Sequence, residues 1–141
     1  MKLSHVQLFT STPLPYMAAH NDLGRQGEDL AAEMLLKKGY KLLERNWRFN
    51  GWEVDIIART KTEIVFVEVK TRSDDSLMLP EEAVDFNRRC RLTSAASAYI
   101  NYHKITLTPR FDVVAIVLNS TRRDIRHIED AFYPVTRRRR Y

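Results

Sequence analysis

Acidic and basic residues recur at a spacing of two in two neighbouring strand-like segments of the sequence. Glu53 and Asp55 alternate in the first segment. Glu68 and Lys70 alternate in the second segment. Because successive side chains of a strand point to opposite faces, each pair shares one face of its strand. If the two segments form a hairpin, Asp55 lies opposite Glu68, or opposite Phe66 with Glu68 diagonal to it. Both registers place the two carboxylates ~5 to 8 Å apart.

Two carboxylates on a largely apolar sheet face predict a metal site. A buried charge without a partner shifts its own pKa or requires a cation that offsets it. Mg²⁺ is usually bound through one or two carboxylates, water and substrate phosphate, which matches Asp55 and Glu68. Lys70 projects from the same face as Glu68, where an amine can hold an attacking water and stabilise negative charge at a phosphorus centre.

The same spacing fits a structural interpretation, and the residues by themselves leave both open. Cross-strand ion pairs on a solvated sheet face use the same residue types, and Glu-x-Lys occurs by chance in many sheets. Glu28 also has two interpretations. It lies in the first turns of a predicted helix, where its carboxylate either points towards the sheet or interacts with the helix dipole.

The elements that must position these side chains follow the order α-β-β-β-α-β-β, which predicts an α/β fold without an internal repeat. Asn21 or Asp22 can cap the first helix, and Gly39 can end it. Pro80 opens the second helix. Asn50-Gly51 is typical of a tight hairpin turn between the first two strands. The strand-like runs cover residues 40–47, 52–58, 64–71, 111–118 and 124–128.

The length of 141 residues predicts one domain with short additions at its ends. Residues 1–20 precede the first periodic segment, and we expect them to form a flexible extension. Within this extension, Met17 is an alternative to Met1 as the start of translation. Residues 21–134 carry all the periodic elements and form the folded domain. Residues 135–141 form a basic tail with four consecutive arginines.

The composition excludes several classes of protein. Hydrophobic residues at 44% and charged residues at 29% exclude wholesale disorder. No apolar stretch approaches the ~20 residues that span a bilayer, so we expect no membrane insertion. In the absence of a secretory signal pattern, the cytoplasm is the expected compartment. The net charge of +5 includes four tail arginines, so it indicates a nucleic-acid partner only weakly. Cys90 and the four histidines lack ligand spacing and are interpreted as structural or surface residues.

Several motifs, in chain order, resemble those of the bacterial YraN-type family. They are Gly24-Arg25-Gln26-Gly27-Glu28, Asn46-Trp47-Arg48, Glu53-Val54-Asp55, Val67-Glu68-Val69-Lys70 and Arg110-Phe111-Asp112-Val113. The resemblance covers about residues 24–132. The family is identified as a member of the restriction-endonuclease-like superfamily with the PD-(D/E)xK signature, and it is similar to archaeal Holliday junction resolvases. The resemblance implies a nuclease-like domain with a central mixed sheet flanked by helices, and metal-dependent cleavage of phosphodiester bonds.

On this resemblance, Asp55 is the signature aspartate, and Glu68 and Lys70 form the Glu-x-Lys pair. Glu28 is the helical acid of the resolvase-like branch and a third candidate metal ligand. Glu53 belongs to a Gly-Glu-x-Asp motif, although Trp52 stands where the family has glycine. Trp52 either fills the corner beside the site or stacks on a nucleobase.

Arg88 takes the place of the lysine that the family usually has in its second helix. The hydrophobic pattern puts it on the inward stripe of that helix. There Arg88 contacts phosphate or pairs with the acids, or it extends its head group to solvent as a snorkelling side chain.

The resemblance implies a Mg²⁺- or Mn²⁺-dependent nuclease that acts on DNA, with branched or structured DNA as one candidate substrate. The catalytic residues would be Glu28, Asp55, Glu68 and Lys70. A homodimer is expected for branched DNA, since two related strands require two sites. One alternative is a nucleic-acid-binding or scaffold module that keeps the fold and cuts little, and another is a domain that binds a protein through its sheet edge. Backbone contacts are expected from Arg72, Arg88, Arg89 and Arg91, and supporting roles from Glu53, Arg110 and Asp112.

Overall fold

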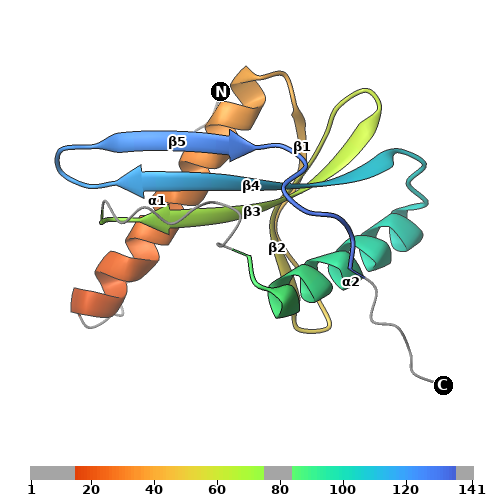
Figure 1. Cartoon of the computed structure of the whole chain (residues 1–141), viewed down its shortest axis with the longest axis horizontal. Helices are drawn as coiled ribbons and strands as arrows, with labels where there is room; N and C mark the ends of the chain where they lie inside the picture. The colour runs from red at the N-terminus through yellow and green to blue at the C-terminus, as the bar shows by residue number, and fades with distance from the viewer. Residues whose placement is uncertain (1–14, 75–83, 136–141) are drawn as a thin grey trace, which may run out of the picture.

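A five-stranded sheet is the centre of the computed structural model, which describes residues 15–74 and 84–135 (Figure 1). The strands lie side by side in chain order. Only β3 and β4 run parallel, while the other neighbours are antiparallel, so the sheet is mixed. The predicted order of elements is confirmed. The strands are β1 (Lys41–Phe49), β2 (Trp52–Arg59), β3 (Glu63–Arg72), β4 (Thr108–Leu118) and β5 (Arg123–Ile128).

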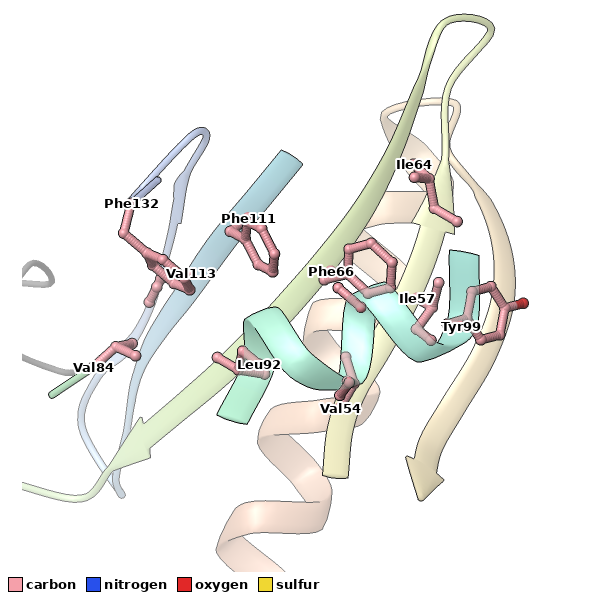
Figure 2. Packing of buried hydrophobic residues seen from close by; sticks show 12 residues of the cluster. Val54, Ile57, Ile64, Phe66, Val84, Leu92, Tyr99, Phe111, Val113 and Phe132 are labelled. Atoms are coloured by element: carbon pink, nitrogen blue, oxygen red, sulfur yellow. The ribbon is translucent and has the colours of Figure 1, made fainter. Parts of the chain in front are cut away.

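The two helices cover opposite faces of the sheet, as expected from the α/β pattern. Helix α1 (Pro15–Lys37) packs on one face, and α2 (Phe86–His103) packs on the other, where it connects the parallel strands β3 and β4. In β3, Val65 and Val67 contact the α1 side and Phe66 contacts the α2 side. Figure 2 shows the α2 side of this core. Its buried residues are Val54, Ile57, Ile64, Phe66, Val84, Leu92, Ala95, Ala96, Tyr99, Phe111, Val113 and Phe132.

Helix α1 begins earlier, and α2 later, than the sequence signals predict. Helix α1 starts at Pro15, before Asn21, because proline fits the first helical position, where its missing N–H has no partner to lose. Helix α2 starts at Phe86. Its N-cap is Asp85, whose side chain accepts a hydrogen bond from the backbone N–H of Arg88 at 2.8 Å. The expected start at Pro80 lies outside the described residues, as do residues 1–14 and 136–141.

Two predicted turns are confirmed by backbone geometry. Asn50 and Gly51 both have positive φ, at 48° and 76°, as a tight β1–β2 hairpin requires. Gly39 ends α1 with a φ of 90°, and the N–H of Tyr40 bonds to the carbonyl of Leu35 at 3.0 Å. Within the described ranges, no helix has the length and apolar character needed to cross a membrane.

Candidate functional site

Asp55 lies where β2 and β3 separate. The paired part of the two strands ends with Ile56 opposite Val67, which puts Asp55 and Glu68 at the next positions of the same register. This is the first of the two predicted registers. The Oδ2 atom of Asp55 accepts a hydrogen bond from the backbone N–H of Val69 at 2.8 Å. The side chain therefore takes a backbone donor beyond the end of the β2–β3 ladder.

The irregular course of β2 explains how Asp55 reaches this position. Val54 and Ile57 both pack in the α2 cluster, whereas Ile56 and Ala58 pack in the α1 cluster. Strict alternation would put Val54 and Ile57 on opposite faces, since they are three residues apart. The strand therefore changes its facing next to Asp55. The periodic sequence pattern gives no sign of this change.

Glu68 is buried and is paired with two cationic side chains. Arg88 forms a bidentate contact, with Nε 3.2 Å from Oε1 and Nη2 2.9 Å from Oε2. The Nζ atom of Lys70 lies 3.5 Å from Oε1, which confirms that Glu68 and Lys70 share a face. The Lys70 side chain is 40% exposed, compared with 4% for Glu68. The site therefore has a buried acidic floor and an amine that reaches its open side.

Arg88 does not extend to solvent as a snorkelling side chain, because its guanidinium turns inward to the acids. Besides Glu68, its Nη2 atom donates to the backbone carbonyl of Glu53 at 3.4 Å. Burial lowers the pKa of Arg88, but the hydrogen bonds and attraction to Glu68, with the charges of Asp55 and Glu53, outweigh burial and raise it overall. Its expected contact with phosphate stays a prediction.

Asp55 carries a charge that its surroundings disfavour. Burial, followed by repulsion from Glu68, raises its pKa from an ordinary value of 3.8 to about 7, and repulsion from Glu28 adds to this. The hydrogen bond from Val69 and the charge of Arg88 oppose the shift only in part. A cation at this point would offset the cost of ionising Asp55.

Glu28 is brought towards the sheet by a close approach of α1 and β3. Gly27 is buried against Thr71, and a Cβ atom added at Gly27 would lie 1.8 Å from Thr71 Oγ1. Only a residue without a side chain permits this contact. The repulsion that Glu28 exerts on Asp55 favours the interpretation in which it faces the sheet. Glu28 also lines an open groove of about 730 Å³ with Asn21, Gly24, Arg25, Asp29, Arg45, Asn46 and Arg48.

Glu53 contacts the site through its backbone. Its carbonyl accepts from Arg88, while its carboxylate lies 3.7 Å from Nη2 of Arg48, an exposed side chain. The contact of Glu53 with the site is therefore made by its backbone carbonyl. The carboxylate itself pairs away from Glu68.

The donor set matches a hard divalent cation with incomplete protein ligation. Among the described residues, no three acidic, histidine or cysteine side chains gather closely enough to hold a metal ion by themselves. Mg²⁺ is usually held by one or two carboxylates and keeps several waters, so Asp55 and Glu68 fit this requirement. Glu28 is then a nearby negative charge rather than a ligand in the arrangement seen here.

Arg110 and Asp112, which were expected to support the site, form an ion pair with each other. Arg110 contacts both Asp112 oxygens, with Nε 2.9 Å from Oδ1 and Nη2 2.8 Å from Oδ2. It also bonds to Tyr40 and to Glu63, the first residue of β3. Glu68 lies further along the same strand, so the pair does not support the acidic site directly. It joins Tyr40, which lies between α1 and β1, to β4.

His127 belongs to this second cluster, which agrees with its interpretation as a structural or surface residue. Its buried ring nitrogen Nε2 lies 2.7 Å from Asp112 Oδ2, and Lys38 Nζ lies 2.9 Å from its Nδ1. Burial raises the pKa of Asp112, but hydrogen bonds from His127, Arg110 and the backbone N–H of Asp130 outweigh burial and lower it overall. No spacing signal links these residues, because they lie on β4, on β5 and in the turns that follow α1 and β5.

The four arginines predicted to bind nucleic acid have different surroundings. Arg88 lies in the acidic site. Arg89 donates to the carbonyl of Val84 at 2.9 Å, and its guanidinium lies 5.6 Å from the centre of the Phe132 ring. Arg72 is the last residue of β3. Arg91 is exposed and lines a groove of about 720 Å³ on α2 with Trp52, Cys90, Thr93, Ser94, Ser97, Ala98, Asn101 and Val135.

Comparison of the sequence with known proteins identifies the family of this chain. The profile described as Uncharacterised protein family UPF0102 matches residues 27–116. The chain belongs to the UPF0102 family. This confirms the YraN-type resemblance, and the UPF0102 match includes every residue predicted to form or support the site.

Relatives similar over most of their length support the same assignment. A UPF0102 protein from Parabacteroides distasonis is 49% identical over 117 residues, which cover 83% of this chain and 97% of the relative. One from Flavobacterium johnsoniae is 47% identical over 121 residues, covering 83% and 98%. Another from Bacteroides thetaiotaomicron is 43% identical over 118 residues, covering 84% and 98%.

Proposed function

We propose that this UPF0102 protein is a divalent-metal-dependent nuclease that hydrolyses DNA phosphodiester bonds, with branched or structured DNA as its substrate. The observation that carries the proposal is the meeting of Asp55 and Glu68 at the point where β2 and β3 separate, with Lys70 at 3.5 Å from Glu68. A purely structural ion-pair cluster would not require an aspartate whose pKa is raised to about 7 by burial and two neighbouring acids.

In this proposal Asp55 and Glu68 would hold Mg²⁺ or Mn²⁺. When bound, such a cation polarises the phosphate and lowers the pKa of an attached water. Lys70 orients the attacking water from the open side of the site and stabilises the negative charge that develops on the phosphate oxygens. Glu28 adds negative potential from α1, which would favour transfer of the cation from bulk water into the site.

DNA is the proposed partner because cationic side chains lie on β3 and α2, which build the site, and in the groove beside Glu28. Arg72 ends β3, and Arg91 is exposed on α2. Arg25 and Arg48 line the groove beside Glu28. Contacts of this kind hold the phosphate backbone without reading its sequence. Cleavage of two related strands at a branch point would require two sites, so a homodimer is part of the proposal.

A second function, a nucleic-acid-binding module with little cleavage, is favoured by one observation. Arg88 already neutralises Glu68 through two contacts at 3.2 and 2.9 Å. A protein that never binds metal could keep its acids stable in this way. The two functions differ in whether cleavage depends on Asp55 and on added metal.

The test is cleavage of labelled linear, single-stranded, flapped and four-way DNA with Mn²⁺, Mg²⁺ or EDTA. Wild-type protein is compared with Asp55→Ala and Lys70→Ala. Lys61→Gln is the matched control, because Lys61 is exposed in the β2–β3 turn, at the far end of both strands. We expect metal-dependent cutting by wild type and Lys61→Gln, and loss of cutting in the other two variants. Tight DNA binding without cutting in either metal would support the binding module instead.

A further inference from the structure

The contacts of Glu68 leave little room for an additional ligand. A carboxylate offers about four lone-pair directions on its two oxygens. Arg88 occupies one direction on each oxygen, and Lys70 approaches Oε1. The side chain of Glu68 is only 4% exposed, so it cannot turn to solvent to present another face. A cation that coordinates Glu68 therefore meets groups that are already in place.

Arg88 is the main obstacle among these groups. Its guanidinium spans both oxygens of Glu68, whereas Lys70 faces only Oε1. A cation on either oxygen would come close to the charge of Arg88 and be repelled by it. The backbone of Arg88 is fixed by the N-cap Asp85, so only its side chain can withdraw. That side chain is 28% exposed, which gives it a path out of the site.

We infer that Arg88 is an internal competitor of the divalent cation: it neutralises Glu68 in the metal-free protein and must withdraw from Glu68 when the cation binds. The inference rests on the proposed metal site and deepens it. Arg88 is then a positioning residue that keeps the acids in place without metal and weakens metal binding. Its withdrawal would also free a guanidinium beside the bound metal for a phosphate group.

The inference predicts the direction in which metal affinity changes when Arg88 is altered. Mn²⁺ binding is measured without DNA, from the electron paramagnetic resonance signal of free Mn²⁺, in metal-stripped protein. We expect Arg88→Gln to bind Mn²⁺ roughly tenfold more tightly than wild type, because it removes both the competing bonds and the repelling charge. Arg88→Lys keeps the charge but contacts one oxygen at a time, so its affinity should lie between the two. Lys61→Gln, which removes an equal charge far from Glu68, should bind as wild type does.

The outcomes separate this inference from the proposed function. If Mn²⁺ binding requires Asp55 but is unchanged or weaker in Arg88→Gln, then Arg88 is not a competitor, and the metal site stands. If neither wild type nor Arg88→Gln shows binding that Asp55→Asn abolishes, then the metal site and the inference both fail.

A second measurement uses only wild-type protein, so it does not depend on whether a variant of Arg88 folds. The Nε–H signal of Arg88 in the nuclear magnetic resonance spectrum of wild-type protein should shift as Mg²⁺ is added, because its bond to Glu68 breaks. An unmoved signal, while Asp55 and its neighbour Val69 respond to Mg²⁺, would overturn the inference.

Discussion

Replacing Asp55 by asparagine should stabilise the metal-free protein. The carboxylate is destabilising in the folded state, where burial, Glu68 and Glu28 raise its pKa from 3.8 to about 7. Asparagine has nearly the same shape, carries no charge, and keeps an oxygen that can accept from the Val69 N–H. The substitution therefore removes the cost of ionisation and retains the bond that positions the side chain.

The magnitude and its pH dependence follow from the pKa shift. A shift of one pKa unit corresponds to about 1.4 kcal/mol, so the shift of Asp55 costs about 4 kcal/mol above pH 7, where the side chain is charged in both states. Between 3.8 and 7 the folded state binds more protons than the unfolded state, so the cost decreases as the pH falls. At pH 5 it is about 2 kcal/mol. The advantage of Asp55→Asn should therefore be larger at pH 8 than at pH 5.

The assay is urea unfolding in EDTA at pH 8 and pH 5, followed by tryptophan fluorescence. Asp22→Asn, a substitution at an exposed position of α1, controls for the change in net charge. Adding Mg²⁺ should stabilise wild type and leave Asp55→Asn unchanged, because ligand binding stabilises only a state that binds the ligand. The reasoning is refuted if Asp55→Asn is less stable than wild type at pH 8, or if its advantage does not shrink at pH 5.

Three other predictions follow from the same structure. Gly27→Ala should cost about 1 to 3 kcal/mol of stability in thermal unfolding, because its Cβ would overlap Thr71. Gly24→Ala, where the added Cβ meets open space, should be neutral or stabilising. Equal effects of the two substitutions would contradict the close approach of α1 and β3. Asp112→Asn should lower the free energy of unfolding by about 3 to 5 kcal/mol at pH 7. The difference from wild type should diminish in acid, as Asp112 of the wild type is protonated near its lowered pKa. If urea unfolding shows that the variant is as stable as wild type at pH 7, this cluster does not stabilise the fold. Lys70→Met should reduce DNA cleavage on the order of 100-fold while Mn²⁺ binding persists, and joint loss of both would show that Lys70 organises the metal site instead.

The sequence predicts well what depends on local pattern. The order of elements, the Asn50-Gly51 turn and the end of α1 at Gly39 follow from periodicity and from residues suited to positive φ. The facing of Glu68 and Lys70 follows from strand alternation. The helix starts were wrong for a physical reason. Several residues can cap or open a helix, and periodicity alone does not select among them, so the starts at Pro15 and after the N-cap Asp85 were not predicted.

The rest of the site depends on contacts between distant segments, which a single sequence does not specify. Arg88 reaches Glu68 across twenty positions, and its inward pairing requires α2 to lie at a particular depth on the sheet. The change of facing in β2 at Asp55 breaks the alternation on which the sequence argument relied. Glu28 raises the pKa of Asp55 from α1, which Gly27 brings close to Thr71 in a contact between the first helix and the third strand.

Two buried aspartates with opposite pKa shifts distinguish the candidate site from the structural cluster. Asp112 accepts bonds from Arg110, His127 and a backbone N–H, and its pKa is lowered below its ordinary value. Asp55 is also buried among charged neighbours, but two of them are acids, and its pKa is raised. Both aspartates stand in the sequence two residues from another charged residue, so the spacing does not distinguish the two sites. The difference lies in whether the fold supplies enough positive charge. At Asp112 it does, and the group stabilises the protein. At Asp55 it does not, and Arg88 offsets only a part of the repulsion. In the proposed function, a divalent cation would add the charge that is missing.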